Sequence, residues 1–147
     1  MNTRGGFLIS QIKQVQGRIF EKLLAKSGVD AFNGAQGRIL YVLWQKDALP
    51  IVALSRQTGL AKTTLTGMLD RLENQGLIIR STEPSDRRQI IIRLTEKAKL
   101  LSEDYARVSN EMAAIFYRGL SEEEIVRFER TLDRILVNLT ESEKNNE

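Results

Sequence analysis

The chain of 147 residues contains no cysteine and no histidine, and it has only two prolines and one tryptophan. Without cysteine it cannot form a disulfide, a thiolate metal site or a thiol redox switch. Without histidine it lacks the commonest general base and the commonest metal ligand. Because it also has no glycine-rich phosphate loop and no carboxylate cluster on an apolar background, we expect neither an enzyme nor a bound metal or cofactor.

Long apolar runs are scarce as well. None approaches the roughly 18 residues that a membrane span requires, and the N-terminal stretch "MNTRGGFLIS" is too weakly apolar for a signal peptide. We therefore expect a cytoplasmic protein without a membrane partner. Apolar residues make up 41% of the chain, enough for a core, and the length suits a single domain over residues 1–147.

Charge is distributed unevenly along the chain. The net charge is +3, but residues 1–100 hold an excess of Lys and Arg, whereas residues 101–147 hold an excess of Asp and Glu. A basic front and an acidic tail favour a polyanion as the partner of one end of the fold. Ordinary scatter of surface charge is the alternative, and charge alone does not decide between the two.

The spacing of apolar residues predicts a mainly α-helical chain with one small β element. Asn33 and Thr95 are suitable N-caps, Pro50 suits the first position of a short helix, and Ser121 with Glu124 forms a capping box. The β-branched runs "LIIR" and "IIIRL" flank a turn-forming loop and predict a hairpin. The expected helices cover residues 7–26, 33–46, 51–58, 61–74, 95–117 and 121–140.

The first and last helices carry apolar stripes that little else in one chain could cover. The last helix repeats apolar residues at heptad spacing from Ile125 to Leu139, which is typical of a helix–helix seam. Such stripes are usually buried against each other and against a second copy of the chain. We therefore expect residues 5–26 and 95–141 to be the dimerisation arms of a homodimer.

Residues 54–78 follow the pattern of a helix-turn-helix, with a short helix, a glycine at the bend and a second helix. The second helix has one apolar face and one small, hydroxyl-rich face that suits a major groove. A plain amphipathic helix with a polar face is the alternative. The candidate DNA-binding residues of this helix are Lys62, Thr63, Thr64, Thr66, Gly67 and Arg71.

The hairpin places two cations at its tip, Arg87 and Arg88, with Asp86 just before them. A hairpin directly after a recognition helix is a wing, whose tip can reach the adjacent minor groove, and arginine suits that narrow, electronegative groove. We expect Asp86 to accept a hydrogen bond from the Arg88 guanidinium and Arg87 to face phosphates. The alternative is a solvated turn, because exposed charge pairs contribute little.

The run from Asn33 to Ala98 resembles the multiple-antibiotic-resistance regulator (MarR) family of winged-helix repressors. The resemblance rests on "NGAQGRILYVLW", "MLDRLENQGLI", the wing "DRRQIIIRLTEKA" and the capping box "SEEE". It implies an α+β winged helix-turn-helix, mainly α, over residues 33–94, with long N- and C-terminal dimerisation helices. It also implies a dimer on a pseudo-palindromic double-stranded DNA operator, acting as a repressor and responding to a ligand. In that family the Arg of the wing D-x-R, here Arg88, enters the minor groove. A winged-helix module that binds proteins and not DNA is the alternative.

The same resemblance implies an effector pocket where the arms meet the winged helix. Arg18, Tyr41 and Trp44 are the candidates for a small aromatic or lipophilic effector, since a cation and aromatic rings suit a phenol or a carboxylate. The alternative is that Tyr41 and Trp44 only form core. The chain departs from the family pattern at Gly67, where members often carry Arg or Pro, and at Ala61, which replaces the usual capping residue. It also lacks the N-terminal cysteine of peroxide-sensing members.

Overall fold

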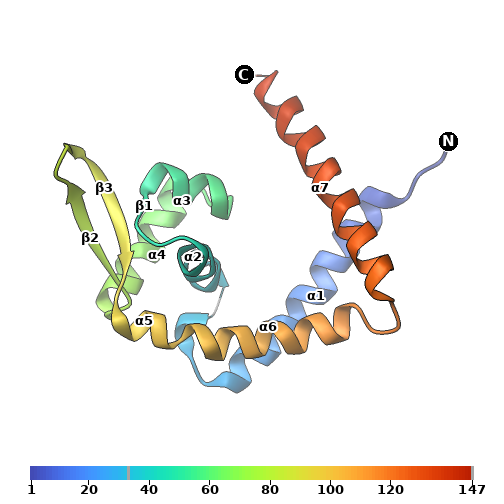
Figure 1. The fold of residues 1–147 in the computed structure, drawn as a ribbon, viewed down its shortest axis with the longest axis horizontal. Coiled ribbons are helices and arrows are strands. Elements are labelled where there is room, and N and C mark those ends of the chain that lie inside the picture. Colours follow the sequence, from blue (N-terminus) through green and yellow to red (C-terminus); the bar gives the residue numbers. More distant parts are fainter. Residues whose placement is uncertain (33, 147) are drawn as a thin grey trace. The chain divides into compact units, whose positions relative to one another are not determined.

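The computed structural model describes residues 1–32 and 34–146 and forms two compact units, residues 1–112 and residues 113–147. The mainly α winged helix-turn-helix predicted from the sequence is confirmed. The predicted cap Asn33 lies outside the described residues. The elements, labelled in Figure 1, are α1 (Gly5–Ser27), a 3-10 turn (Asp30–Phe32), α2 (Gly34–Gln45), β1 (Leu49–Pro50), α3 (Ile51–Thr58), α4 (Lys62–Asn74), β2 (Ile78–Glu83), β3 (Asp86–Leu94), α5 (Glu96–Leu100), α6 (Ser102–Phe116) and α7 (Glu122–Lys144).

Two helix ends follow the signals in the sequence closely. Gly28 ends α1 in the left-handed conformation, at a φ of 72°, where a residue without Cβ is favoured. At the start of α7 the Ser121 hydroxyl accepts from the Glu124 amide at 3.2 Å, and the Glu124 carboxylate accepts from the Ser121 amide at 2.8 Å. The predicted capping box is therefore confirmed.

The role expected of Pro50 was wrong by one position. Pro50 is the N-cap of α3, with extended backbone at φ −67° and ψ 152°, and is not the first helical residue. Together with Leu49 it forms the short strand β1, which pairs antiparallel with β3 through Leu49–Ile92 and Pro50–Ile91. A proline can occupy such an edge strand because its missing N–H does not interrupt a ladder on both sides.

The single long helix expected over residues 95–117 is also interrupted. It is divided into α5 and α6 at Leu101. The Ala98 carbonyl accepts the indole N–H of Trp44 at 3.0 Å and the Leu101 amide, three residues on, at 3.2 Å. A side chain that takes a carbonyl out of the i to i+4 ladder is a known cause of a helix break.

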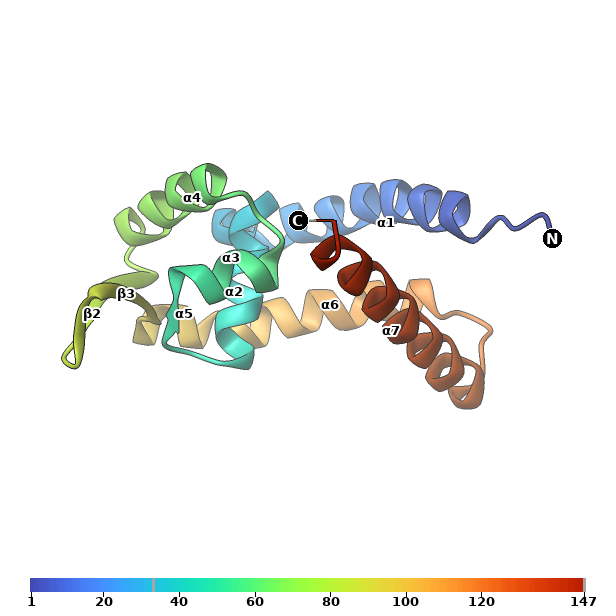
Figure 2. The same ribbon diagram turned by 90° about the horizontal axis from the view of Figure 1, so that it is seen from above.

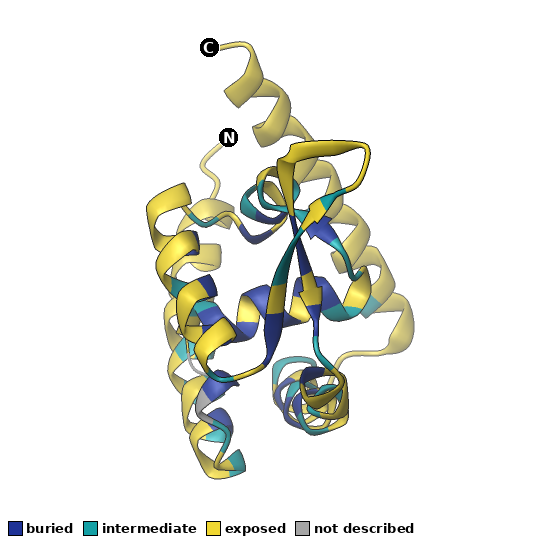
Figure 3. Ribbon diagram, turned by 90° about the vertical axis from the view of Figure 1, so that its left-hand side faces the viewer, coloured by how far each residue is buried: buried dark blue, intermediate teal, exposed yellow. Residues whose placement is uncertain are grey.

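The core of the first unit lies where α2, α3 and α4 meet a small antiparallel sheet of order β1-β3-β2. Figure 3 shows the buried stretches of β2 and β3 at the base of the hairpin, whereas the tip is exposed. In Figures 1 and 2 the tip extends away from the helices of this unit. The fully buried large side chains include Leu40, Leu54, Leu65, Leu69, Leu72 and Ile92.

The terminal helices keep much of their apolar surface exposed. Within Glu122–Lys144 no residue is buried, and the apolar side chains Leu136 and Leu139 are exposed in α7. In α1 the exposed apolar residues are Phe7, Leu8, Ile9, Ile12 and Val15. Neither unit alone covers these stripes.

Candidate nucleic-acid interface and aromatic hollow

Helix α4 presents its hydroxyl-rich face to solvent, as expected of a recognition helix. Its apolar residues Leu65, Leu69 and Leu72 are buried, which fixes the helix on the core. Ala61, at the N-cap, makes no side-chain capping bond, so the helix begins without that stabilisation. The six candidate residues of this helix are all exposed: Lys62, Thr63, Thr64, Thr66, Gly67 and Arg71.

Gly67 lies in the middle of this exposed face without any packing reason for a glycine. A Cβ added at Gly67 would meet nothing within 4 Å, and its φ is not positive. A glycine in a helix interior is less favourable than alanine by about 0.8–1.0 kcal/mol. Gly67 therefore lowers the stability of α4, and no packing contact in the fold requires a glycine there. Its missing side chain leaves a notch on the polar face of the helix.

The wing tip is exposed, and its aspartate makes a contact that the sequence reasoning did not foresee. The Asp86 carboxylate accepts the backbone N–H of Arg88 at 3.0 Å, and not the guanidinium as we expected. This contact closes a local turn of the kind that Asp favours. Asp86 thus fixes the backbone from which Arg88 projects, and both Arg87 and Arg88 remain exposed.

A hollow of about 380 Å³ separates the wing from the starts of α3 and α4. Lys62 from α4 and Arg88 from β3 both line it, so cations from the two candidate elements border the same concave surface. Its other lining residues are Pro50, Ile51, Val52, Asp86, Gln89 and Ile90. A basic hollow of this shape can accept an anionic backbone.

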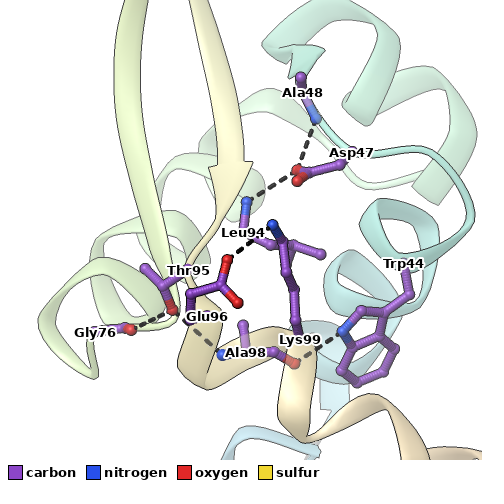
Figure 4. A network of polar contacts seen from close by, with 9 residues as sticks. All are labelled: Trp44, Asp47, Ala48, Gly76, Leu94, Thr95, Glu96, Ala98 and Lys99. Carbon is purple, nitrogen blue, oxygen red and sulfur yellow. Dashed lines mark hydrogen bonds and ion pairs between the residues drawn. The ribbon is translucent and has the colours of Figure 1, made fainter.

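The segment that joins the wing to α5 is held by the end of α2 (Figure 4). The Asp47 carboxylate accepts the amide of Leu94 at 2.9 Å and that of Ala48 at 2.7 Å. Ala48 has a φ of 59°, a left-handed value that is uncommon for a residue with Cβ. Trp44, three residues before Asp47, donates its indole N–H to the carbonyl of Ala98, which lies four residues after Leu94. Residues 44–47, at and just after the end of α2, therefore contact both ends of residues 94–98.

The same segment is also fixed to the end of the recognition helix. The Thr95 hydroxyl donates to the Gly76 carbonyl at 2.7 Å and accepts from the Ala98 amide at 3.3 Å, while the Lys97 ammonium donates to the Gln75 carbonyl at 2.9 Å. Residues 94–98 are thus a junction of α2, α4, β3 and α5. A shift of α2 against this junction would reach both DNA-facing elements.

Beside this junction lies a hollow of about 450 Å³ with aromatic walls. Tyr105 of α6 packs against Trp44 with ring centroids 5.1 Å apart and against Tyr41 at 6.1 Å. Burial raises the pKa of the Tyr105 phenol above its ordinary 10.0, Tyr41 adds to that rise, and Arg38 opposes it. The lining residues are Tyr41, Trp44, Gln45, Ser102, Glu103, Tyr105, Ala106, Ser109 and Asn110.

Comparisons with known proteins identify this architecture. The family model described as "MarR family" matches residues 32–90. The organic hydroperoxide resistance transcriptional regulator of Bacillus subtilis is 42% identical over 64 residues, which are 44% of this chain and 44% of that protein. Residues 32–90 of the chain are therefore similar to the MarR family. The alignment spans less than half the length of that Bacillus relative.

Solved structures extend the similarity to nearly nine tenths of the chain. A cysteine-to-serine variant of E. coli MarR complexed with operator DNA has a TM-score of 0.77 at 25% identity, covering 89% of this chain and 92% of that one. Bordetella bronchiseptica BpsR, whose DNA binding is regulated by 6-hydroxynicotinic acid, has a TM-score of 0.77 at 25% identity, covering 88% and 91%. No described helix of the chain is long and apolar enough to cross a membrane.

The sequence reasoning placed some candidate residues together and missed others. Tyr41 and Trp44 do line one hollow, but Arg18 is exposed on α1 and is not among the described residues that line it. Tyr105 was assigned only to the apolar stripe of its helix, and its position at the centre of the aromatic cluster carries no local signal. Asp47 was missed because its partner Leu94 is 47 residues away.

Proposed function

We propose that the chain is a dimeric, sequence-specific DNA-binding regulator of transcription, acting as a repressor that responds to a small ligand. The observation that carries this proposal is the basic hollow between the wing and the recognition helix, bordered by Lys62 and Arg88. It lies beside the exposed hydroxyl-rich face of α4, on a core that fixes both elements. The similarity of residues 32–90 to the MarR family supports the same function.

In this proposal each candidate residue has a defined role. The exposed face of α4 enters the major groove, where Thr63, Thr64 and Thr66 contact base edges or phosphates and Gly67 allows close approach. Lys62 and Arg71 contact phosphates from its flanks. Arg88 enters the minor groove from the wing, Asp86 holds the turn, and Arg87 faces phosphates.

The dimer in this proposal uses the helical arms, residues 5–26 and 95–141, on either side of the winged part at 33–94. The apolar residues that α1 and α7 expose would form a large adhesive surface on a monomer. A second copy of the chain covers them and relates two winged parts by a dyad. Two recognition helices then require a pseudo-palindrome with half-sites about one helical turn, roughly 10 bp, apart.

The test is to select bound fragments from a random DNA pool and to titrate the protein against the selected duplex and a scrambled duplex. A regulator binds the selected duplex far more tightly, and binding to both falls steeply with salt. Insertion of about five base pairs at the dyad should abolish tight binding. A winged helix that binds only proteins would select no sequence and show no salt-dependent binding.

A second part of the proposal concerns the aromatic hollow, which we assign to the effector. Its rings suit a small aromatic or lipophilic molecule. Glu103 is the one charged residue among the described residues that line it, and Arg18 does not line it, so neutral or cationic aromatics should bind better than aromatic acids. Trp44, the single tryptophan, makes fluorescence a direct reporter of binding. Unchanged emission across a library of neutral, cationic and anionic aromatics would remove this assignment.

Two further features belong to the same proposal. The chain works without a catalytic step and without a metal or cofactor, since neither role is needed for binding DNA. Its place is the cytoplasm. Because the chain has no cysteine, its response does not use thiol oxidation.

A further inference from the structure

One arginine connects the wing directly to the recognition helix. Arg80 is the third residue of β2, and its cross-strand partner Ile92 is fully buried. Its guanidinium donates to the Asp70 carboxylate at 2.8 Å and to the Glu73 carboxylate at 3.5 Å. Both acids lie on α4, three residues apart, and the Arg80 side chain is only 26% exposed. The contact therefore joins the stem of the wing to the second half of α4.

The ion pairs of Arg80 hold the stem of the hairpin, and the position of the stem determines the position of Arg88 at the wing tip. Arg88 lies four residues before Ile92 in β3, toward the tip of the hairpin, which is about 13 Å at the rise of a strand. A tilt of about 10° at the stem would move the tip by about 2 Å, enough to displace a side chain from a groove contact. Holding the stem thus fixes the distance between the wing tip and the exposed face of α4.

Arg80 also compensates a charge on the surface that faces DNA. Asp70 follows Thr63 and Gly67 at steps of four and three residues, so it lies on the same exposed ridge of α4. The Asp70 side chain is 59% exposed, and a carboxylate there repels phosphates unless a cation is paired with it. The guanidinium at 2.8 Å provides that cation from inside the protein.

We propose that Arg80 is a positioning residue for DNA binding, which sets the wing against the recognition helix and neutralises Asp70 without itself contacting DNA. This inference rests on the proposed DNA-binding function. Because the Asp70 side chain is 59% exposed, its ion pair with Arg80 contributes little to folding. The effect of losing Arg80 should therefore appear in binding and hardly in stability. If Arg80 had a purely structural role, its loss would lower the stability of the fold and hardly change DNA binding.

The experiment uses the full chain and the duplex selected from the random pool. Arg80→Ala and Arg80→Lys are compared with Arg93→Ala, which removes the same charge from the opposite face of the hairpin, where Arg93 donates to the Ser81 hydroxyl. Thermal melting, dissociation constants and the salt dependence of binding are measured for each. Arg80→Ala should weaken binding at least tenfold more than Arg93→Ala, with an unchanged melting temperature and an unchanged salt slope. Arg80→Lys should be intermediate, since it keeps a point charge and loses the fork.

Two coupled variants separate positioning from other roles. Asp70→Asn in the Arg80→Ala background should recover part of the lost affinity, because it removes the uncompensated charge. Arg88→Ala should have little further effect in that background, because the wing tip is already displaced. Equal losses for Arg80→Ala and Arg93→Ala, or an undiminished effect of Arg88→Ala, would overturn the inference. A salt slope lower by about one unit per contact would also overturn it, since Arg80 would then bind phosphate itself. If the wild-type chain selects no DNA, the proposed function fails instead.

Discussion

The sharpest test of the wing concerns Asp86, because two physical arguments predict opposite signs for one substitution. The Asp86 carboxylate accepts the Arg88 amide at 3.0 Å in an exposed turn. Asp86→Ala removes this acceptor and also removes a negative charge close to the proposed phosphates. Electrostatics alone predicts tighter binding, by a fraction of a kcal/mol at an exposed site. Loss of the turn predicts weaker binding, because the backbone at Arg88 must then be ordered when the wing docks.

The magnitude follows from the hydrogen bond that is lost. A net contribution of about 0.5–1.5 kcal/mol for one bond, present in both wings of a dimer, gives about 1–3 kcal/mol. At 1.4 kcal/mol for each factor of ten, the dissociation constant should rise roughly 5- to 150-fold. This exceeds the electrostatic gain, so the turn should prevail and Asp86→Ala should bind more weakly.

Asp86→Asn is the matched control, because asparagine keeps a side-chain oxygen that can accept the Arg88 amide while it removes the charge. Fluorescence anisotropy at fixed salt should rank Asp86→Asn equal to or tighter than the wild type and Asp86→Ala weaker than both. In a chain that already carries Arg88→Ala, Asp86→Ala should cause little further loss. If Asp86→Ala binds more tightly than Asp86→Asn, the turn has no part in binding and the reasoning is wrong.

Three other substitutions test separate parts of the structure. Gly67→Ala should raise the free energy of unfolding by about 0.5–1 kcal/mol, since the new methyl group meets nothing, yet weaken operator binding. Denaturant melts should therefore show higher stability while anisotropy shows lower affinity. Unchanged affinity would mean that the notch at Gly67 does not face DNA. Leu132→Asp puts a charge into the heptad seam of α7 and should dissociate the dimer. Sedimentation at micromolar concentration should show a dimer for the wild type and a monomer for the variant, and a folded wild-type monomer would contradict the dimer proposal. Because the pKa of Tyr105 is raised in the folded chain, the stability that its neutral phenol contributes is fully present below pH 10 and is lost as the pH rises through the folded-state pKa. Tyr105→Phe should therefore flatten the loss of stability in melts between pH 9 and about 11. An unaltered pH profile would mean that another group causes this loss.

Most of the fold could be predicted from local patterns in the sequence. The apolar spacing located α1, α6 and α7, although it joined α5 to α6, and the capping box at Ser121 located the start of α7 within one residue. The hairpin was evident from two β-branched runs around a turn. These features depend on neighbours within about four residues, so the sequence states them directly.

The features that local patterns missed depend on distant partners. Strand β1 has two residues and no periodicity of its own, and it exists because Leu49 meets Ile92. The break at Leu101 results from a tryptophan 54 residues before Ala98. In the candidate site, the two arginines at the wing tip were predicted from their position after the turn of the hairpin. The contacts of Arg80, Asp47 and Tyr105 required the folded chain.

The contacts between the end of α2 and residues 94–98 also determine how the winged part can fold. Asp47 and Leu94 enclose nearly fifty residues, which include α3, α4 and the whole hairpin. Closing a loop of that length costs roughly 3 kcal/mol of conformational free energy at room temperature, and the contacts of Asp47 and Trp44 with residues 94–98 do not form until it is closed. The recognition helix and the wing should therefore fold and unfold together, in one late step, even though each has ample local signals of its own. Amide exchange at Leu94, whose N–H is bonded to Asp47, should report that joint opening at a single residue.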